Sequence, residues 1–165
     1  MEIRTARLVL RRAVPADVGG MYEILSSPEA MRFWSTLPHE SMAVTEAWFE
    51  EQFFSGKPER DEWIIAHNGR VIGNVGIWNM PEFGFILHPD AWGKGFATEA
   101  ARAFIDYAFA THPIEDITAD VDPDNAASLK VMKKLGFAET RRAERTFLIG
   151  GKWFDSVYLS LPRPR

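Results

Sequence analysis

His88-Pro89-Asp90-Ala91-Trp92-Gly93-Lys94-Gly95-Phe96-Ala97-Thr98-Glu99-Ala100 lies near the middle of the chain, between a predicted strand and a predicted helix. Gly93 and Gly95 let the backbone turn without obstruction by a Cβ atom, and the free amides of the loop then converge with the N-terminus of the helix. This arrangement suits a pyrophosphate group. A plain tight turn before a helix would require the same two glycines.

Two common nucleotide-binding motifs do not fit this loop. A dinucleotide fingerprint needs a third glycine where the chain has Thr98, and a Walker loop needs Ser or Thr directly after Gly-Lys, where the chain has Gly95. A nucleotide-binding protein therefore remains only a minor alternative. It would predict thermal stabilisation by NAD or ATP.

Around the loop, apolar residues alternate between the period-two pattern of strands and the helical pattern. Asn68-Gly69 predicts a hairpin turn, and a glycine follows each of two predicted helices. We expect helices at about Pro15–Leu25, Met42–Phe54, Gly93–Ala110 and Asn125–Leu135. We expect strands at Leu8–Leu10, Trp63–Ala66, Val71–Trp78, Glu82–Leu87 and Ile117–Val121, then one beginning at Phe137 and one ending at Leu161. No internal repeat or linker interrupts this order.

A second motif, Asn125-Ala126-Ala127-Ser128 followed by Lys134-Leu135-Gly136-Phe137, makes the pattern specific. Together with the glycine loop it resembles the GNAT family of N-acetyltransferases, in the branch of the ribosomal-protein N-terminal alanine acetyltransferases. That branch shows W-G-x-G-[YF]-A-T-E-A, then N-x-x-S and K-L-G-F, and every position is filled here. Asp90 departs from the broader family, which usually has Gln or Arg there, so a potential phosphate partner is replaced by an acid.

The resemblance implies a single α+β domain over residues 1–165 with the GNAT acyl-CoA N-acyltransferase fold. Its mixed, mostly antiparallel sheet would have about seven strands, with a central, splayed parallel pair and about four helices. The length of 165 residues and 46% hydrophobic content agree with one globular domain.

Charge and cysteine content restrict the function further. The net charge of −4 argues against a nucleic-acid binder, and the absence of cysteine removes disulfides, thiolate metal sites and cysteine nucleophiles. Residues 1–123 carry 10 basic and 19 acidic side chains, whereas residues 124–165 carry 9 basic and 4 acidic ones. The positive end predicts an anion site, and the acidic remainder favours a cationic amine.

The resemblance also implies acetyl-CoA as cosubstrate, without a metal. Strand residues near Phe85 to Leu87 would pair with the pantetheine arm, the loop would hold the pyrophosphate, and Lys134, with Lys130 or Lys133, would bind the adenosine phosphate. Lysines on a short helix are also commonly a solvated face. The predicted cofactor-binding residues are Phe85, Ile86, Leu87, Trp92, Gly93, Lys94, Gly95, Phe96, Ala97, Thr98, Asn125, Ser128 and Lys134.

Two residues are predicted to be catalytic. Ser128 would donate a proton to the departing thiolate, because the branch has Ser there and no Tyr lies on this helix; an ordinary helical serine is the alternative. Glu82 would be the general base at the start of a central strand, or else an exposed strand-end acid. His88 and His39 are the next choices as base.

The acceptor stays open between a protein N-terminus and a small amine such as a polyamine, amino acid or aminoglycoside. Candidate contacts, any of which can equally be structural, are Trp34, His39, Trp63, Trp78, Trp153 and Asp155. A non-enzymatic acyl-CoA-binding module or sensor is the alternative function. No signal peptide or membrane span is recognised, so we expect a cytoplasmic protein without membrane or nucleic-acid partners, and a homodimer is plausible.

Overall fold

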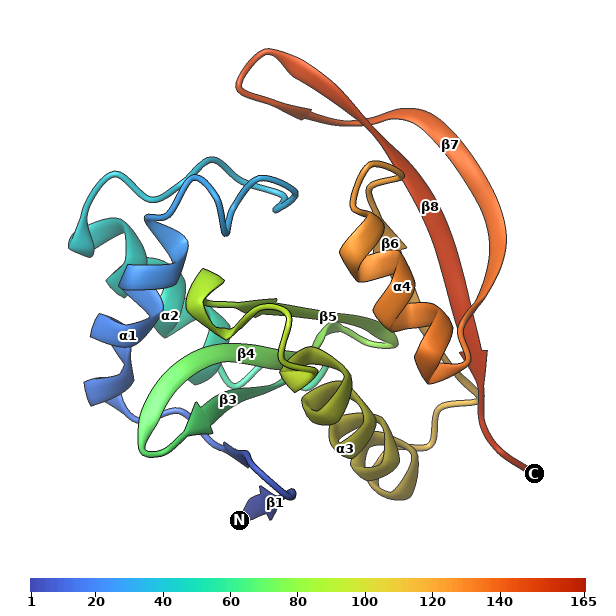
Figure 1. Cartoon of the computed structure of the whole chain (residues 1–165), viewed down its shortest axis with the longest axis horizontal. Coiled ribbons are helices and arrows are strands. Elements are labelled where there is room, and N and C mark those ends of the chain that lie inside the picture. The colour runs from blue at the N-terminus through green and yellow to red at the C-terminus, as the bar shows by residue number, and fades with distance from the viewer.

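The computed structural model describes residues 1–165 and contains one eight-stranded sheet (Figure 1). The strands lie in the order β1-β2-β3-β4-β5-β6-β8-β7. Their bounds are β1 Glu2–Arg4, β2 Val9–Arg11, β3 Asp61–His67, β4 Arg70–Asn79, β5 Glu82–Leu87, β6 Asp116–Val121, β7 Ala138–Ile149 and β8 Lys152–Pro162. The sequence predicted about seven of them. The additional strand, β1, has three residues, too few for a period-two pattern to identify.

The sheet divides between β5 and β6. This is the only parallel pair, and a single register position joins it, Glu82 opposite Thr118. All other neighbouring strands are antiparallel, and β4 pairs with β5 from Asn79 to Gly73. Beyond Glu82 the edge of β5 that faces β6 is therefore unpaired, which confirms the predicted splayed pair. The gap exposes backbone groups of β5 to a ligand.

Four α-helices cover the sheet, as predicted: α1 Val18–Leu25, α2 Met42–Phe54, α3 Phe96–Thr111 and α4 Ala126–Leu135, with short 3-10 turns η1 Pro15–Asp17 and η2 Pro89–Ala91. The apolar stripe of α3, including Ala100, Phe104 and Ala108, is fully buried in the larger core cluster. Met132 and Leu135 bring α4 into the same cluster. The predicted helical periodicity therefore has its cause in packing against the sheet.

The other face of the sheet carries α1 and α2. Ile64 on β3 and Ile86 on β5 join a second cluster with Met21, Ile24 and Phe49 from these helices. Trp63 and Ile65, the neighbours of Ile64, belong to the larger cluster instead. The alternation of side chains along a strand thus builds two cores on opposite faces.

The long β7–β8 hairpin extends beyond the rest of the sheet (Figure 1). Its Gly150-Gly151 turn has φ values of 58° and 79°, as the predicted turn requires. A Cβ atom on Gly150 would come within 3.1 Å of the Leu37 side chain, so the hairpin tip lies against the loop between α1 and α2. None of the helices is long and apolar enough to cross a membrane.

Candidate active site

The glycine loop has the geometry that its sequence predicts. Gly93 and Gly95 adopt φ values of 69° and 80°, and Gly95 is the N-cap of α3. These left-handed conformations are strained for residues with a Cβ atom. The Trp92 indole N–H donates to the carbonyl oxygen of Leu87 at 3.1 Å, which ties the loop to the end of β5. The loop amides are therefore held beside the N-terminus of α3.

Arg7 and Glu99 fix this loop from the opposite side. Arg7 Nη1 donates to the carbonyl oxygen of Lys94 at 2.8 Å, and Arg7 Nε donates to Glu99 Oε2 at 2.8 Å. Thr5 Oγ1 donates to Glu99 Oε1 at 2.6 Å. Burial opposes ionisation of Glu99, but the hydrogen bonds from Thr5 and Arg7 outweigh it and lower the pKa of this carboxyl. The sequence interpretation assigned no role to either residue in holding the loop.

A groove of about 600 Å³ runs from the splayed edge of β5 past the loop to α4. Most of the predicted cofactor-binding residues line it, although they come from three separate segments. They are Phe85, Ile86, Leu87, Trp92, Gly93, Gly95, Phe96, Ala97, Thr98, Asn125, Ser128 and Lys134. The structure thus brings these residues together around one cavity long enough to pass from β5 to the basic helix.

Lys94 is the exception. Its Nζ donates to the carbonyl oxygen of Asp90 at 2.8 Å, and the residue does not line the groove. Lys130 lines the groove beside Lys134, whereas Lys133 does not. An anion at this end would therefore meet Lys130 and Lys134, and any contribution of Lys94 would have to come from its backbone.

Arg32 lines the same groove and was not predicted. It belongs to the loop between α1 and α2, which lacks the periodicity that would identify a functional face. Its guanidinium lies 4.9 Å from the centre of the Phe33 ring. Arg32 therefore adds a third positive charge to the groove, from a segment far in sequence from α4.

A second cavity of about 290 Å³ adjoins the groove. Five residues line both cavities: Phe33, Trp34, Phe85, Asn125 and Ser128. Asn125 caps α4, since its Oδ1 accepts from the backbone N–H of Ser128 at 3.2 Å. Asp122 Oδ1 accepts from the backbone N–H of Asp124 at 2.8 Å, just before α4. The cap holds Ser128 at the junction between the two cavities.

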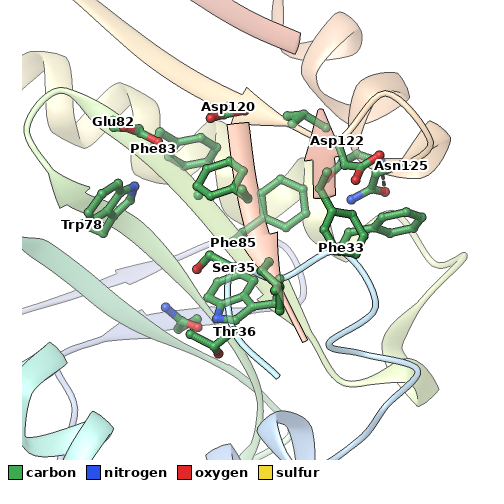
Figure 2. Close-up of a pocket in the computed structure, with 18 of the residues that line it drawn as sticks. Phe33, Ser35, Thr36, Trp78, Glu82, Phe83, Phe85, Asp120, Asp122 and Asn125 are labelled. Carbon is green, nitrogen blue, oxygen red and sulfur yellow. Dashed lines mark hydrogen bonds between the residues drawn. The ribbon is translucent and has the colours of Figure 1, made fainter. Parts of the chain in front are cut away.

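Glu82 and Asp120 lie together at one end of the second cavity (Figure 2). Burial raises the pKa of Glu82, and the nearby Asp120 charge raises it further, while Trp78 opposes the shift. Burial is also the main reason that the pKa of Asp120 is raised. A raised pKa brings the titration of a half-buried carboxyl closer to neutral pH, where a general base works best.

The second cavity is acidic. Five carboxylates line it and no Lys, Arg or His does; the carboxylates belong to Glu62, Glu82, Asp120, Asp122 and Asp155. We call this cavity the acidic pocket. Its lining produces a negative potential that attracts cations and disfavours anions.

The other candidate residues divide between this pocket and structural positions. Trp34, Trp78 and Asp155 line the acidic pocket, and Asp155 Oδ1 also accepts from the backbone of Arg145 at 2.9 Å. Trp63 is fully buried, and its indole donates to Asp61. Trp153 is exposed and lines neither cavity.

Neither His39 nor His88 lines the groove or the acidic pocket. His88 Nδ1 accepts from the backbone N–H of Asp90 at 3.1 Å and caps η2. His39 is buried against Thr45, with 2.8 Å between Nδ1 and Oγ1, and burial lowers its pKa. Of the residues considered as base, only Glu82 is in the pocket. The structure contains no group of three or more His, Cys, Asp and Glu side chains that could hold a metal ion.

The fold and the site are those of acyltransferases that place a long cosubstrate between strands. The defining features are a splayed parallel pair, a glycine loop before a helix and two joined cavities. The family model described as an acetyltransferase (GNAT) domain matches residues 7–138. The chain belongs to the GNAT family of N-acetyltransferases, as its motifs predicted.

Named relatives agree with this assignment. An uncharacterised N-acetyltransferase p20 of Bacillus licheniformis is 30% identical over 81% of this chain and 80% of its own length. The spermidine N(1)-acetyltransferase of Escherichia coli K12 is 23% identical over 92% of this chain and 84% of its own. The crystal structure of a ribosomal-protein-S5-alanine acetyltransferase from Vibrio fischeri superposes with a TM-score of 0.82 at 20% identity, covering 99% and 97% of the two chains. The predicted resemblance to that branch is thus matched by a shared fold.

Proposed function

We propose that the protein transfers the acetyl group of acetyl-CoA to a primary amine, by direct attack in a ternary complex. The observation that carries this proposal is the meeting of the groove and the acidic pocket at Phe85, Asn125 and Ser128. One cavity has the length and basic end that a phosphorylated cosubstrate needs, and the other is acidic. A thioester at their junction would face an amine bound in the pocket.

The residues of the groove fit the cosubstrate along its length. The loop amides at Gly93 and Gly95 suit a pyrophosphate, and Arg32, Lys130 and Lys134 supply positive charge for the phosphates. The unpaired edge of β5 offers backbone groups to the pantetheine arm. When bound, acetyl-CoA supplies an activated thioester, and a backbone N–H near Phe85 would stabilise the negative charge that develops on its oxygen.

Glu82 accepts the proton that the amine must lose. An ammonium group cannot attack, so its deprotonation in the pocket precedes formation of the new C–N bond. Ser128 stands at the junction, where the C–S bond breaks, and donates a proton to the departing thiolate. Asn125 orients Ser128 through the cap of α4.

The acidic lining supports a small cationic amine as the acceptor, since the pocket concentrates cations. The spermidine acetyltransferases among the relatives act on such a molecule. A protein N-terminus is the second candidate, supported by the ribosomal-protein acetyltransferase among the structural neighbours.

Labelled acetyl-CoA, incubated with the purified protein and a panel of amines and N-terminal peptides, tests the proposal by mass spectrometry. We expect acetylated amine and free CoA thiol in equal amounts. If acetyl-CoA binds and no amine in the panel is acetylated, the protein is a non-enzymatic acyl-CoA sensor and the proposal fails.

A further inference from the structure

A strip of sheet runs from Glu62 to Gly84, and both of these residues line the acidic pocket. Glu62 on β3 is opposite Gly76 on β4, and Gly76 is opposite Gly84 on β5. The strip therefore spans two strand spacings, about 10 Å. A Cβ atom on Gly84 would meet nothing within 4 Å, so the space above it is open. Three parts of the pocket are thus separate: Glu62 on β3, the cavity junction at Phe85 and Asn125, and the end that holds Glu82 (Figure 2).

The end at Glu62 contains an unsatisfied polar atom. Asn74 is 2% exposed and lines the pocket, and its Oδ1 is the only buried side-chain nitrogen or oxygen without a hydrogen-bond partner. Its Nδ2 donates to Glu62 Oε2 at 2.5 Å, which fixes the amide so that Oδ1 remains free. A buried polar atom without a partner costs free energy unless a ligand completes it. The missing partner must be a hydrogen-bond donor.

Glu62 is the ionisable member of this end. It is 9% exposed, and Gln52 Nε2 donates to its Oε1 at 2.7 Å. Together, Glu62 and Asn74 present a carboxylate and an amide oxygen, which are both hydrogen-bond acceptors. A primary ammonium group carries three N–H donors and a positive charge, so it complements both side chains.

We propose that Glu62 and Asn74 bind a second ammonium group of the acceptor, which is therefore a small diamine or longer polyamine lying across Gly84. Its reactive amine lies at the junction beside Ser128, and its second amine lies at Glu62. This inference rests on the proposed acetyl transfer and names the substrate class of the same site. No basic residue lines the pocket, and Arg60, whose positive charge acts on Glu62, lies outside the lining.

The test compares α,ω-diamines of increasing length with n-alkylamines in which a methyl group replaces the second amine. For the best length, we expect kcat/KM of the wild-type protein to be about 10- to 100-fold higher for the diamine, as a charge-assisted hydrogen bond gives. Glu62→Gln and Asn74→Leu should raise KM for the diamine by that factor. They should lower kcat/KM for the alkylamine by a much smaller factor, because its methyl end makes no hydrogen bond at Glu62 and it senses only the weaker negative potential of the pocket.

Glu50→Gln is the matched control, since it removes the same charge from an exposed position of α2 outside the pocket. It should keep the full preference for the diamine. Binding of CoA checks that each variant is folded, and if Asn74→Leu does not fold, Glu62→Gln decides alone.

Equal kcat/KM for diamine and alkylamine in the wild-type protein, or a preference that survives Glu62→Gln, overturns the inference and leaves the proposed acetyl transfer intact. Acetylation of no amine at all overturns both. The two failures are therefore distinguishable in one experiment.

Discussion

The guanidinium of Arg7 lies 4.6 Å from the centre of the Phe96 ring and donates to the carbonyl oxygen of Lys94 at 2.8 Å. Phe96 is the first residue of α3, so Arg7 holds the loop and the helix start in one position. A loop that binds phosphate through its amides depends on such fixation, because a mobile loop loses entropy when it binds.

Arg7→Ala should therefore weaken acetyl-CoA binding although Arg7 does not line the groove. We expect the Kd to rise about 5- to 20-fold, less than for the loss of a direct charge-assisted hydrogen bond, because Arg7 acts only through the loop. Titration calorimetry measures the change, with Arg4→Ala as the control because Arg4 is an exposed residue paired only with Glu2. Unchanged affinity in Arg7→Ala would show that the loop holds its form without this contact.

Lys134→Ala should also raise the Kd for acetyl-CoA, by about 3- to 10-fold, and should reduce its dependence on salt. The reason is direct loss of a positive charge from the groove. Lys133→Ala removes the same charge from outside the groove and should have a smaller effect. Equal effects of the two substitutions would indicate a diffuse field over α4 in place of a contact at Lys134.

The contrast between lysines illustrates what the sequence could predict. The periodic α3 and the hairpin at Asn68-Gly69 follow from local patterns, and the structure contains both. Lys94 belongs to the same loop motif, yet its side chain is used within the loop. A motif identifies the backbone conformation better than it identifies the direction of a long side chain.

The acidic pocket was predictable only in part. Glu82 was recognised because it begins a strand beside the glycine loop. Glu62 and Asn74 were not, since Glu62 ends a charged run before the strand predicted from Trp63, and Asn74 appears as one polar residue within a strand. Their meeting depends on the register of β3 against β4. Arg32 was missed because the loop between α1 and α2 has no periodic pattern.

Glu82→Gln tests the general base through the pH profile. Because the pKa of Glu82 is raised, kcat/KM of the wild-type protein should rise with pH through a limb above the ordinary range of a glutamate. The variant should lose about 10²- to 10⁴-fold at neutral pH and should lack this limb. Asp120→Asn removes a neighbouring negative charge that raises the pKa of Glu82, so it should move the limb to lower pH. If the limb of the pH profile persists in Glu82→Gln, it reports the titration of another group.

Ser128→Ala tests the proton donor. If Ser128 protonates the thiolate, kcat should fall about 10²-fold at saturating substrates, whereas the Kd for acetyl-CoA should change little. The cap of α4 remains, because Asn125 accepts from the backbone N–H of residue 128. Stopped assays of CoA thiol release measure kcat, and full turnover of the variant would place the proton source elsewhere.

Glu62 links the acidic pocket to stability. Burial raises its pKa from the ordinary 4.5 to about 7, against opposing hydrogen bonds from Gln52 and Asn74. Arg60 lowers and Asp61 raises the pKa by smaller amounts. The folded protein therefore binds more protons than the unfolded chain between these two pH values, and its free energy of unfolding decreases as pH rises through that window.

Over this window the free energy of unfolding of the wild-type protein should fall by about 3 kcal/mol relative to that of Glu62→Gln, whose residue 62 stays neutral at every pH. Urea unfolding at pH values from about 5 to about 8 measures the difference between the two proteins, with Glu50→Gln expected to follow wild type. A difference that is constant over this range would mean that Glu62 is not penalised by burial. A saturating diamine should reduce the loss, because an ammonium group at Asn74 compensates the buried charge of Glu62, whereas the matching alkylamine should not.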